Sequence, residues 1–166
     1  MHQKLTKKLF HLFTGELAAT IIFAVVWLMF LNIHEWTNAY LTSFAPLFAF
    51  LLLEFLLVQG SYYWFLKWTQ AKRKDFSKLP DHQLKFFQHL KRVNLFLLGV
   101  GFVLVIYELL YFPKEFFWFL FLYLFALGEY INYYHVRLSY QTTEEAKEFM
   151  RHKKFRTSKL AEELKK

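Results

Sequence analysis

Four glutamates stand inside the long apolar stretches of this 166-residue chain, one in each stretch: Glu16, Glu54, Glu108 and Glu129. If the stretches cross a bilayer, each charged side chain there costs roughly 2.5–3.5 kcal/mol on insertion scales. No lysine or arginine accompanies the glutamates in the central part of the stretches. Such a carboxyl group is expected to be protonated, to hold a cation or to face water. All three states indicate ion or proton handling and a polar interior.

The spacing of polar residues sharpens this hypothesis in the last stretch. Glu129, Asn132, Tyr133 and Arg137 recur at helical spacing and share one face. The planar fork of Arg137 can grip a phosphate or carboxylate, and Lys67 ends the second stretch at a similar predicted depth. The two cations are therefore expected to converge on one anionic group, unless each simply reaches the bulk lipid headgroups. The predicted ligand- or ion-binding residues are Glu54, Glu108, Glu129, Asn132, Tyr133, Arg137 and Lys67.

Several of the other polar residues have a simpler interpretation. Asn94, Gln59, Ser61 and Thr20 are expected to form hydrogen bonds between helices. The chain has no cysteine, which excludes disulfides and thiol catalysis. Neither Glu-x-x-His nor His-x-x-x-His spacing occurs, and there is no glycine-rich phosphate loop. We therefore predict no metal site and no cofactor, and we assign no catalytic residue.

The apolar stretches that carry these residues are long enough to cross a membrane. Each reaches the approximately 20 residues that a transmembrane helix needs, and no alternating strand pattern is present. The sequence predicts an all-α integral membrane protein, a bundle of four transmembrane helices arranged as two hairpins. A tight turn at 113–115 joins the second pair, and Asp81 is expected to start the third helix well before the membrane. The predicted spans are 13–33, 44–66, 93–112 and 116–135.

The basic residues indicate how the bundle is oriented. Of the 21 lysines and arginines, all except Lys114 fall in the N-terminal segment, the middle connection with its flanks, or the C-terminal region. Both termini and the middle connection are therefore expected to be cytoplasmic, with the protein in the cell membrane. The net charge of +8 is a topology signal and gives no reason to expect a nucleic-acid partner.

The sequence predicts a transmembrane domain at 1–140 and a helical cytoplasmic tail at 141–166. The tail is basic and amphipathic, and it is expected either to lie on anionic lipid headgroups or to be solvated.

Three functional hypotheses fit this pattern. The first is binding or translocation of a small cation, a proton-coupled solute or a lipid headgroup in the carboxylate-lined interior. The second is an accessory or assembly subunit that docks a larger membrane partner through its polar faces. The third is a lipid-modifying enzyme with its site at Glu129, Asn132, Tyr133, His135 and Arg137. Because four helices enclose a narrow interior, a transport path is expected to need a homo-oligomer or a larger complex.

Overall fold

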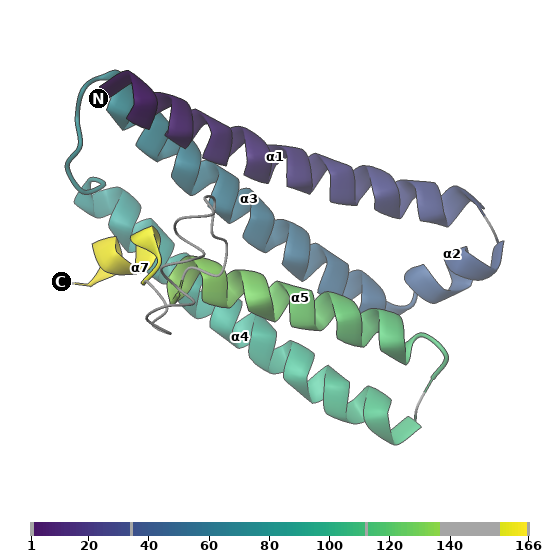
Figure 1. The fold of residues 1–166 in the computed structure, drawn as a ribbon. Helices are drawn as coiled ribbons and strands as arrows, with labels where there is room; N and C mark the ends of the chain where they lie inside the picture. The colour runs from purple at the N-terminus through teal and green to yellow at the C-terminus, as the bar shows by residue number, and fades with distance from the viewer. Residues whose placement is uncertain (1, 34, 112, 137–156, 166) are drawn as a thin grey trace, which may run out of the picture.

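The computed structural model of the chain describes residues 2–33, 35–111, 113–136 and 157–165. Four of its helices are long and apolar enough to cross a membrane, as the sequence predicts. The described residues contain no strand, only an isolated β-bridge between Val136 and Thr157. The helices are α1 (His2–Ile33), α2 (Glu35–Leu41), α3 (Phe44–Lys72), α4 (Asp81–Tyr111), α5 (Phe116–Tyr134) and α7 (Lys159–Leu164) (Figure 1).

The helix boundaries differ from the apolar stretches because polar residues extend the helices beyond them. Helix α1 begins at His2 and α3 continues to Lys72, while α4 begins at Asp81 as predicted. Helix α3 ends in two reversed hydrogen bonds, from Lys74 N to Ala71 O (3.0 Å) and from Asp75 N to Gln70 O (3.0 Å). This is the Schellman arrangement, in which the residue after the cap takes a left-handed conformation. Here that residue is Lys74, with φ of 60°.

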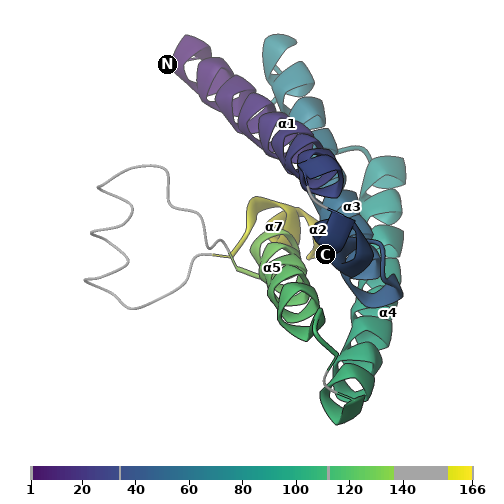
Figure 2. The same ribbon diagram turned by 90° about the vertical axis from the view of Figure 1, so that its right-hand side faces the viewer.

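Helix α3 lies at the centre of the bundle. Helix α1 runs antiparallel along it, with the rings of Trp27 and Phe50 stacked 4.1 Å apart. Figure 2 shows α1 and α4 on opposite sides of α3. Two glycines let the other helices approach closely. The ring of Tyr133 on α5 occupies the space where Gly60 of α3 would carry a side chain, and Tyr123 of α5 does the same at Gly101 of α4.

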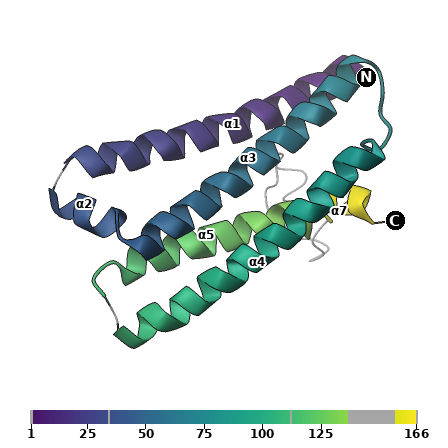
Figure 3. The ribbon, with the colours of Figure 1, turned by 180° about the vertical axis from the view of Figure 1, so that it is seen from behind.

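The two ends of the bundle carry different connections. The start of α1, the connection between α3 and α4, and α7 lie at one end, whereas α2 and the turn between α4 and α5 lie at the other (Figures 1 and 3). The described basic segments of the chain therefore gather at the first end, which we call the basic end.

The described part of the C-terminal region packs on the bundle. Leu160 and Ala161 of α7 are buried. The Ser158 hydroxyl caps α7 by accepting from Ala161 N (3.0 Å), and it donates to the backbone carbonyl of Tyr133. Glu163 forms an ion pair with Lys67 of α3 (2.8 Å). The sequence predicted a solvated or headgroup-bound tail, and its stretch 141–156 lies outside the described residues.

Candidate functional site

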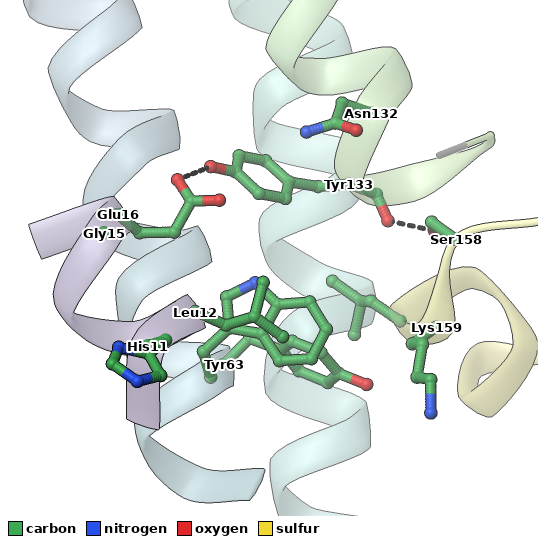
Figure 4. A pocket seen from close by; sticks show the side chains of 11 residues that line it. His11, Leu12, Gly15, Glu16, Tyr63, Asn132, Tyr133, Ser158 and Lys159 are labelled. Carbon is green, nitrogen blue, oxygen red and sulfur yellow. Dashed lines mark hydrogen bonds between the residues drawn. The ribbon is translucent and has the colours of Figure 1, made fainter. Parts of the chain in front are cut away.

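A cavity of about 300 Å³ lies between α1, α3, α5 and the start of α7 at the basic end (Figure 4). Its volume is at the lower limit of ordinary small-ligand pockets. We call it the carboxylate–tyrosine pocket. The polar residues that line it are His11, Glu16, Tyr63, Asn132, Tyr133, Ser158 and Lys159.

Tyr133 is the residue that ties the walls of this pocket together. Its side chain is buried, and its hydroxyl donates a 2.5 Å hydrogen bond to Glu16 Oε2 on α1. Such a length is typical of a hydroxyl bound to a carboxylate. Its backbone carbonyl accepts from Ser158, so a single tyrosine joins α1 to the segment that starts α7. Tyr133 is held in this position by its contact with Gly60 of α3.

A second carboxylate lies beside this pair. Glu129 is one turn before Tyr133 on α5, and its Oε2 accepts from Asn132 Nδ2 (3.3 Å). It is close enough to act electrostatically on both Tyr133 and Glu16. The structure thus brings the predicted residues Glu129, Asn132 and Tyr133 together and adds Glu16 from the opposite helix.

The wall of the pocket also contains aromatic side chains. Trp64 lines it together with Tyr63, and their rings meet edge to face at 5.0 Å. A cation is attracted by the face of an aromatic ring and by a nearby carboxylate such as Glu16. The arrangement is therefore chemically suited to a small organic cation.

A separate network of buried polar side chains joins the helices at the centre of the bundle. The side-chain amides of Gln59 and Asn94 bond to each other in both directions (3.1 and 2.7 Å), and Tyr134 donates to Gln59 Oε1 (2.7 Å). All three side chains are buried. They join α3, α4 and α5, which confirms the interhelical role predicted for Gln59 and Asn94. The same prediction is wrong for Thr20, whose hydroxyl bonds within its own helix to Glu16 O (3.0 Å), and for Ser61, whose hydroxyl has no hydrogen-bond partner in the described structure.

Other predicted site residues lie apart from the pocket. Lys67 is engaged by Glu163 and also donates to Gln70 Oε1 (3.2 Å) and Ser77 O (3.0 Å). Arg137 lies outside the described residues, so its convergence with Lys67 stays a prediction. Glu54 and Glu108 each have one buried carboxyl oxygen without a hydrogen-bond partner in the described structure.

Sequence reasoning did not assign Glu16, Tyr63, Ser158 or Lys159 to the site. Glu16 had a signal, since it is one of the four glutamates in apolar stretches, but nothing in the sequence pairs it with the polar face of the last stretch. Ser158 and Lys159 had none, because nothing in the sequence predicts that α7 packs on the bundle. Within the described ranges, no three histidine, aspartate or glutamate side chains are placed to hold a metal ion.

No known protein family, curated protein or solved structure matches this chain.

Proposed function

We propose that this protein is a multi-pass membrane protein that binds a small ammonium-bearing solute or headgroup in the carboxylate–tyrosine pocket. The observation that carries the proposal is the approach of Glu16 and Glu129, from two different helices, to Tyr133. Glu16 and Tyr133 line the cavity of about 300 Å³, and Glu129 lies beside it. Neither carboxylate has an ion-pair partner among the described residues. A bound ammonium group would supply the missing positive charge.

The pocket is at the basic end, which we infer to be the cytoplasmic end of a cell-membrane protein. The ligand would then enter from the cytoplasm or from the inner leaflet. The expected partners are anionic lipids around the basic end and either a second copy of the chain or a larger membrane partner.

Calorimetric titration of the detergent-solubilised protein with ethanolamine tests the proposal. Wild-type protein is expected to bind, and Glu16→Gln, which keeps the size of the side chain but removes its charge, is expected to weaken binding at least about tenfold. Glu115→Gln, at the opposite end of the bundle, is the matched control and should bind like wild type. Absence of binding, or equal binding by Glu16→Gln, would overturn the proposal.

Translocation of a cation or proton is the second candidate, and the buried unpartnered oxygens of Glu54 and Glu108 favour it. In liposomes containing a pH-sensitive dye, Glu54→Gln and Glu108→Gln should slow proton flux without altering ethanolamine binding. Flux equal to that of protein-free liposomes would exclude proton translocation. The docking-subunit and lipid-modifying hypotheses stay predictions, the second because Arg137 lies outside the described residues.

A further inference from the structure

A second cavity, of about 270 Å³, lies between α1, α2, α3 and α5, toward the end of the bundle opposite the basic end. It shares no lining residue with the carboxylate–tyrosine pocket. Most of the residues that line it are aromatic, so we call it the aromatic cavity. Its phenylalanines and tryptophans are Phe23, Trp27, Phe30, Phe50, Trp118 and Phe121.

The aromatic cavity has a buried floor and an exposed rim. Phe50 of α3 and Leu122 of α5 form the floor, with 8% and 6% of their surfaces exposed. Val26 of α1 and Phe121 of α5 belong to the rim, with 40% and 58% exposed. The exposed lining residues all come from α1 and α5, so the cavity opens at the side of the bundle between these two helices.

Two aromatic pairs frame this opening, because each joins α1 to α5. The rings of Phe30 and Trp118 are 6.4 Å apart, and those of Phe23 and Phe125 are 5.5 Å apart. Along each helix the two pairs are seven residues apart, or about 10 Å at 1.5 Å per residue. Val26 and Phe121 lie between the pairs, and we call this opening the lateral window.

The depth of the lateral window determines what can enter it. The window lies within the predicted spans 13–33 and 116–135, so it faces lipid hydrocarbon in the proposed membrane arrangement. Phe23 is ten residues before Ile33, the end of α1, which corresponds to about 15 Å. One leaflet contributes about 15 Å of hydrocarbon, half of the core of a bilayer. The aromatic cavity therefore spans the depth that the acyl chains of one leaflet occupy.

The lining favours an apolar occupant. Among the described lining residues, polar groups are limited to the hydroxyls of Thr37 and Tyr40 and the indole N–H groups of Trp27 and Trp118. A buried water needs two to four polar partners, whereas apolar cavities of about 150 Å³ already take up apolar molecules. The aromatic cavity is larger than that and has a direct opening to hydrocarbon.

From this geometry we infer that the aromatic cavity binds one acyl chain of a phospholipid in the leaflet away from the basic end. The chain enters through the lateral window and packs on Phe50 and Leu122. The inference rests on the proposed membrane arrangement and is independent of the ammonium ligand, because the two cavities share no lining residue.

Photocrosslinking in nanodiscs tests this inference. The nanodiscs contain a small fraction of phosphatidylcholine with a diazirine midway along one acyl chain, and labelled residues are mapped by mass spectrometry. Wild-type protein should be labelled at Phe50 and Leu122, which the bulk lipid does not reach because both are buried. Phe102 of α4 is exposed and does not line the cavity, so it reports labelling by bulk lipid.

Two tryptophan substitutions on α1 test the route of entry. Val26→Trp should reduce the labelling of Phe50 and Leu122 to background, because the larger side chain fills the lateral window. Ile22→Trp is the matched control, since Ile22 is exposed one turn away and does not line the cavity. It should keep the full labelling of both residues.

The outcomes separate this inference from the membrane arrangement. Labelling of Phe102 without labelling of Phe50 and Leu122 would show that the chain stays outside, so the inference is wrong and the membrane arrangement stands. If none of the three is labelled, both are wrong. Equal labelling of Phe50 and Leu122 in Val26→Trp, or its loss in both tryptophan variants, would contradict entry through the lateral window.

A second arm identifies the source of the chain. A free fatty acid with the same diazirine replaces the phosphatidylcholine at equal mole fraction. If the fatty acid labels Phe50 and Leu122 and the phospholipid does not, the ligand is a free fatty acid and the assignment to a phospholipid is wrong. Labelling of both residues by the phospholipid supports it.

Discussion

The Tyr133 hydroxyl, which the proposed function places at the ligand, packs against Gly60 of α3. A Cβ at position 60 would overlap the hydroxyl end of the Tyr133 ring, so the ring would have to shift. We predict that Gly60→Ala displaces Tyr133 from Glu16, abolishes measurable ethanolamine binding and destabilises the fold by about 1–3 kcal/mol through overpacking. Calorimetry and reversible unfolding in mixed detergent micelles measure the two effects.

Gly99 provides the control for this substitution. It lies on α4 with open space where its side chain would be. Gly99→Ala should retain binding and, if anything, stabilise α4 by about 0.5–1 kcal/mol, because alanine is the better helix former. Normal binding by Gly60→Ala would show that Tyr133 can reach Glu16 from another position.

Two adjacent tyrosines have different roles that mutation can separate. Tyr134 belongs to the central network with Gln59, while Tyr133 belongs to the pocket. Tyr134→Phe is predicted to lower the free energy of unfolding by about 0.6 kcal/mol, the mean for hydrogen bonds between membrane helices, and to leave ethanolamine affinity unchanged. Tyr133→Phe is predicted to weaken that affinity. A reversal of these two effects would exchange the roles assigned here.

The end of helix α3 contains a conformational strain that a single substitution can relieve. Lys74 adopts a left-handed conformation, which costs a residue with a Cβ roughly 1–2 kcal/mol. Glycine avoids this steric cost but loses more chain entropy on folding, so substitution by glycine recovers only part of it. We predict that Lys74→Gly stabilises the protein by about 0.5–1 kcal/mol in reversible unfolding. Arg73→Gly is the control, since φ at Arg73 is −82° and glycine should destabilise there.

The connection after α3 is expected to respond to acid. A hydrogen bond from the backbone N–H of Ser77 to Asp75 Oδ1 (2.9 Å) lowers the pKa of Asp75 below its usual 3.8. Because the folded pKa is the lower one, the stabilisation is complete above the usual value and is lost as pH falls through the folded value. The protection factor of the Ser77 amide, which corrects for the slower intrinsic exchange in acid, should therefore fall as pH drops through the folded pKa of Asp75, and Asp75→Ala should remove this response. The assignment is wrong if the ratio of Ser77 amide exchange in wild type to that in Asp75→Ala stays the same at every pH.

The elements show what the sequence could and could not predict. The four long helices follow from apolar length, and the shared face of Glu129, Asn132 and Tyr133 follows from helical spacing. Spacing along one helix does not identify the partner on another, so the pairing of Tyr133 with Glu16, 117 residues apart, was not predictable. A helical tail was predicted, but the packing of α7 on the bundle was not, because its apolar residues, Leu160 and Leu164, fit a membrane surface as well as a protein surface.

At the scale of the whole molecule, the proposed function depends on which side of the membrane the basic end faces. The pocket, the connection between α3 and α4, and α7 all lie there, so the side of the membrane that the basic end faces decides from where a ligand reaches Glu16. Lysine and arginine flank the cytoplasmic ends of membrane helices far more often than the outer ends. The twenty basic residues outside the two outer connections therefore predict that the pocket opens toward the cytoplasm.

Single cysteines test this orientation cleanly, because the chain has none of its own. Asn38 on α2 and Ser77 in the connection after α3 are both exposed and lie at opposite ends of the bundle. In intact cells, a membrane-impermeant maleimide should label Asn38→Cys and leave Ser77→Cys unlabelled. After solubilisation, both should react equally, which controls for intrinsic reactivity. Labelling of Ser77→Cys alone would show that the protein has the opposite orientation, with the pocket on the outer side. Labelling of both variants in intact cells would show that α1 to α4 do not form the four-span arrangement proposed here.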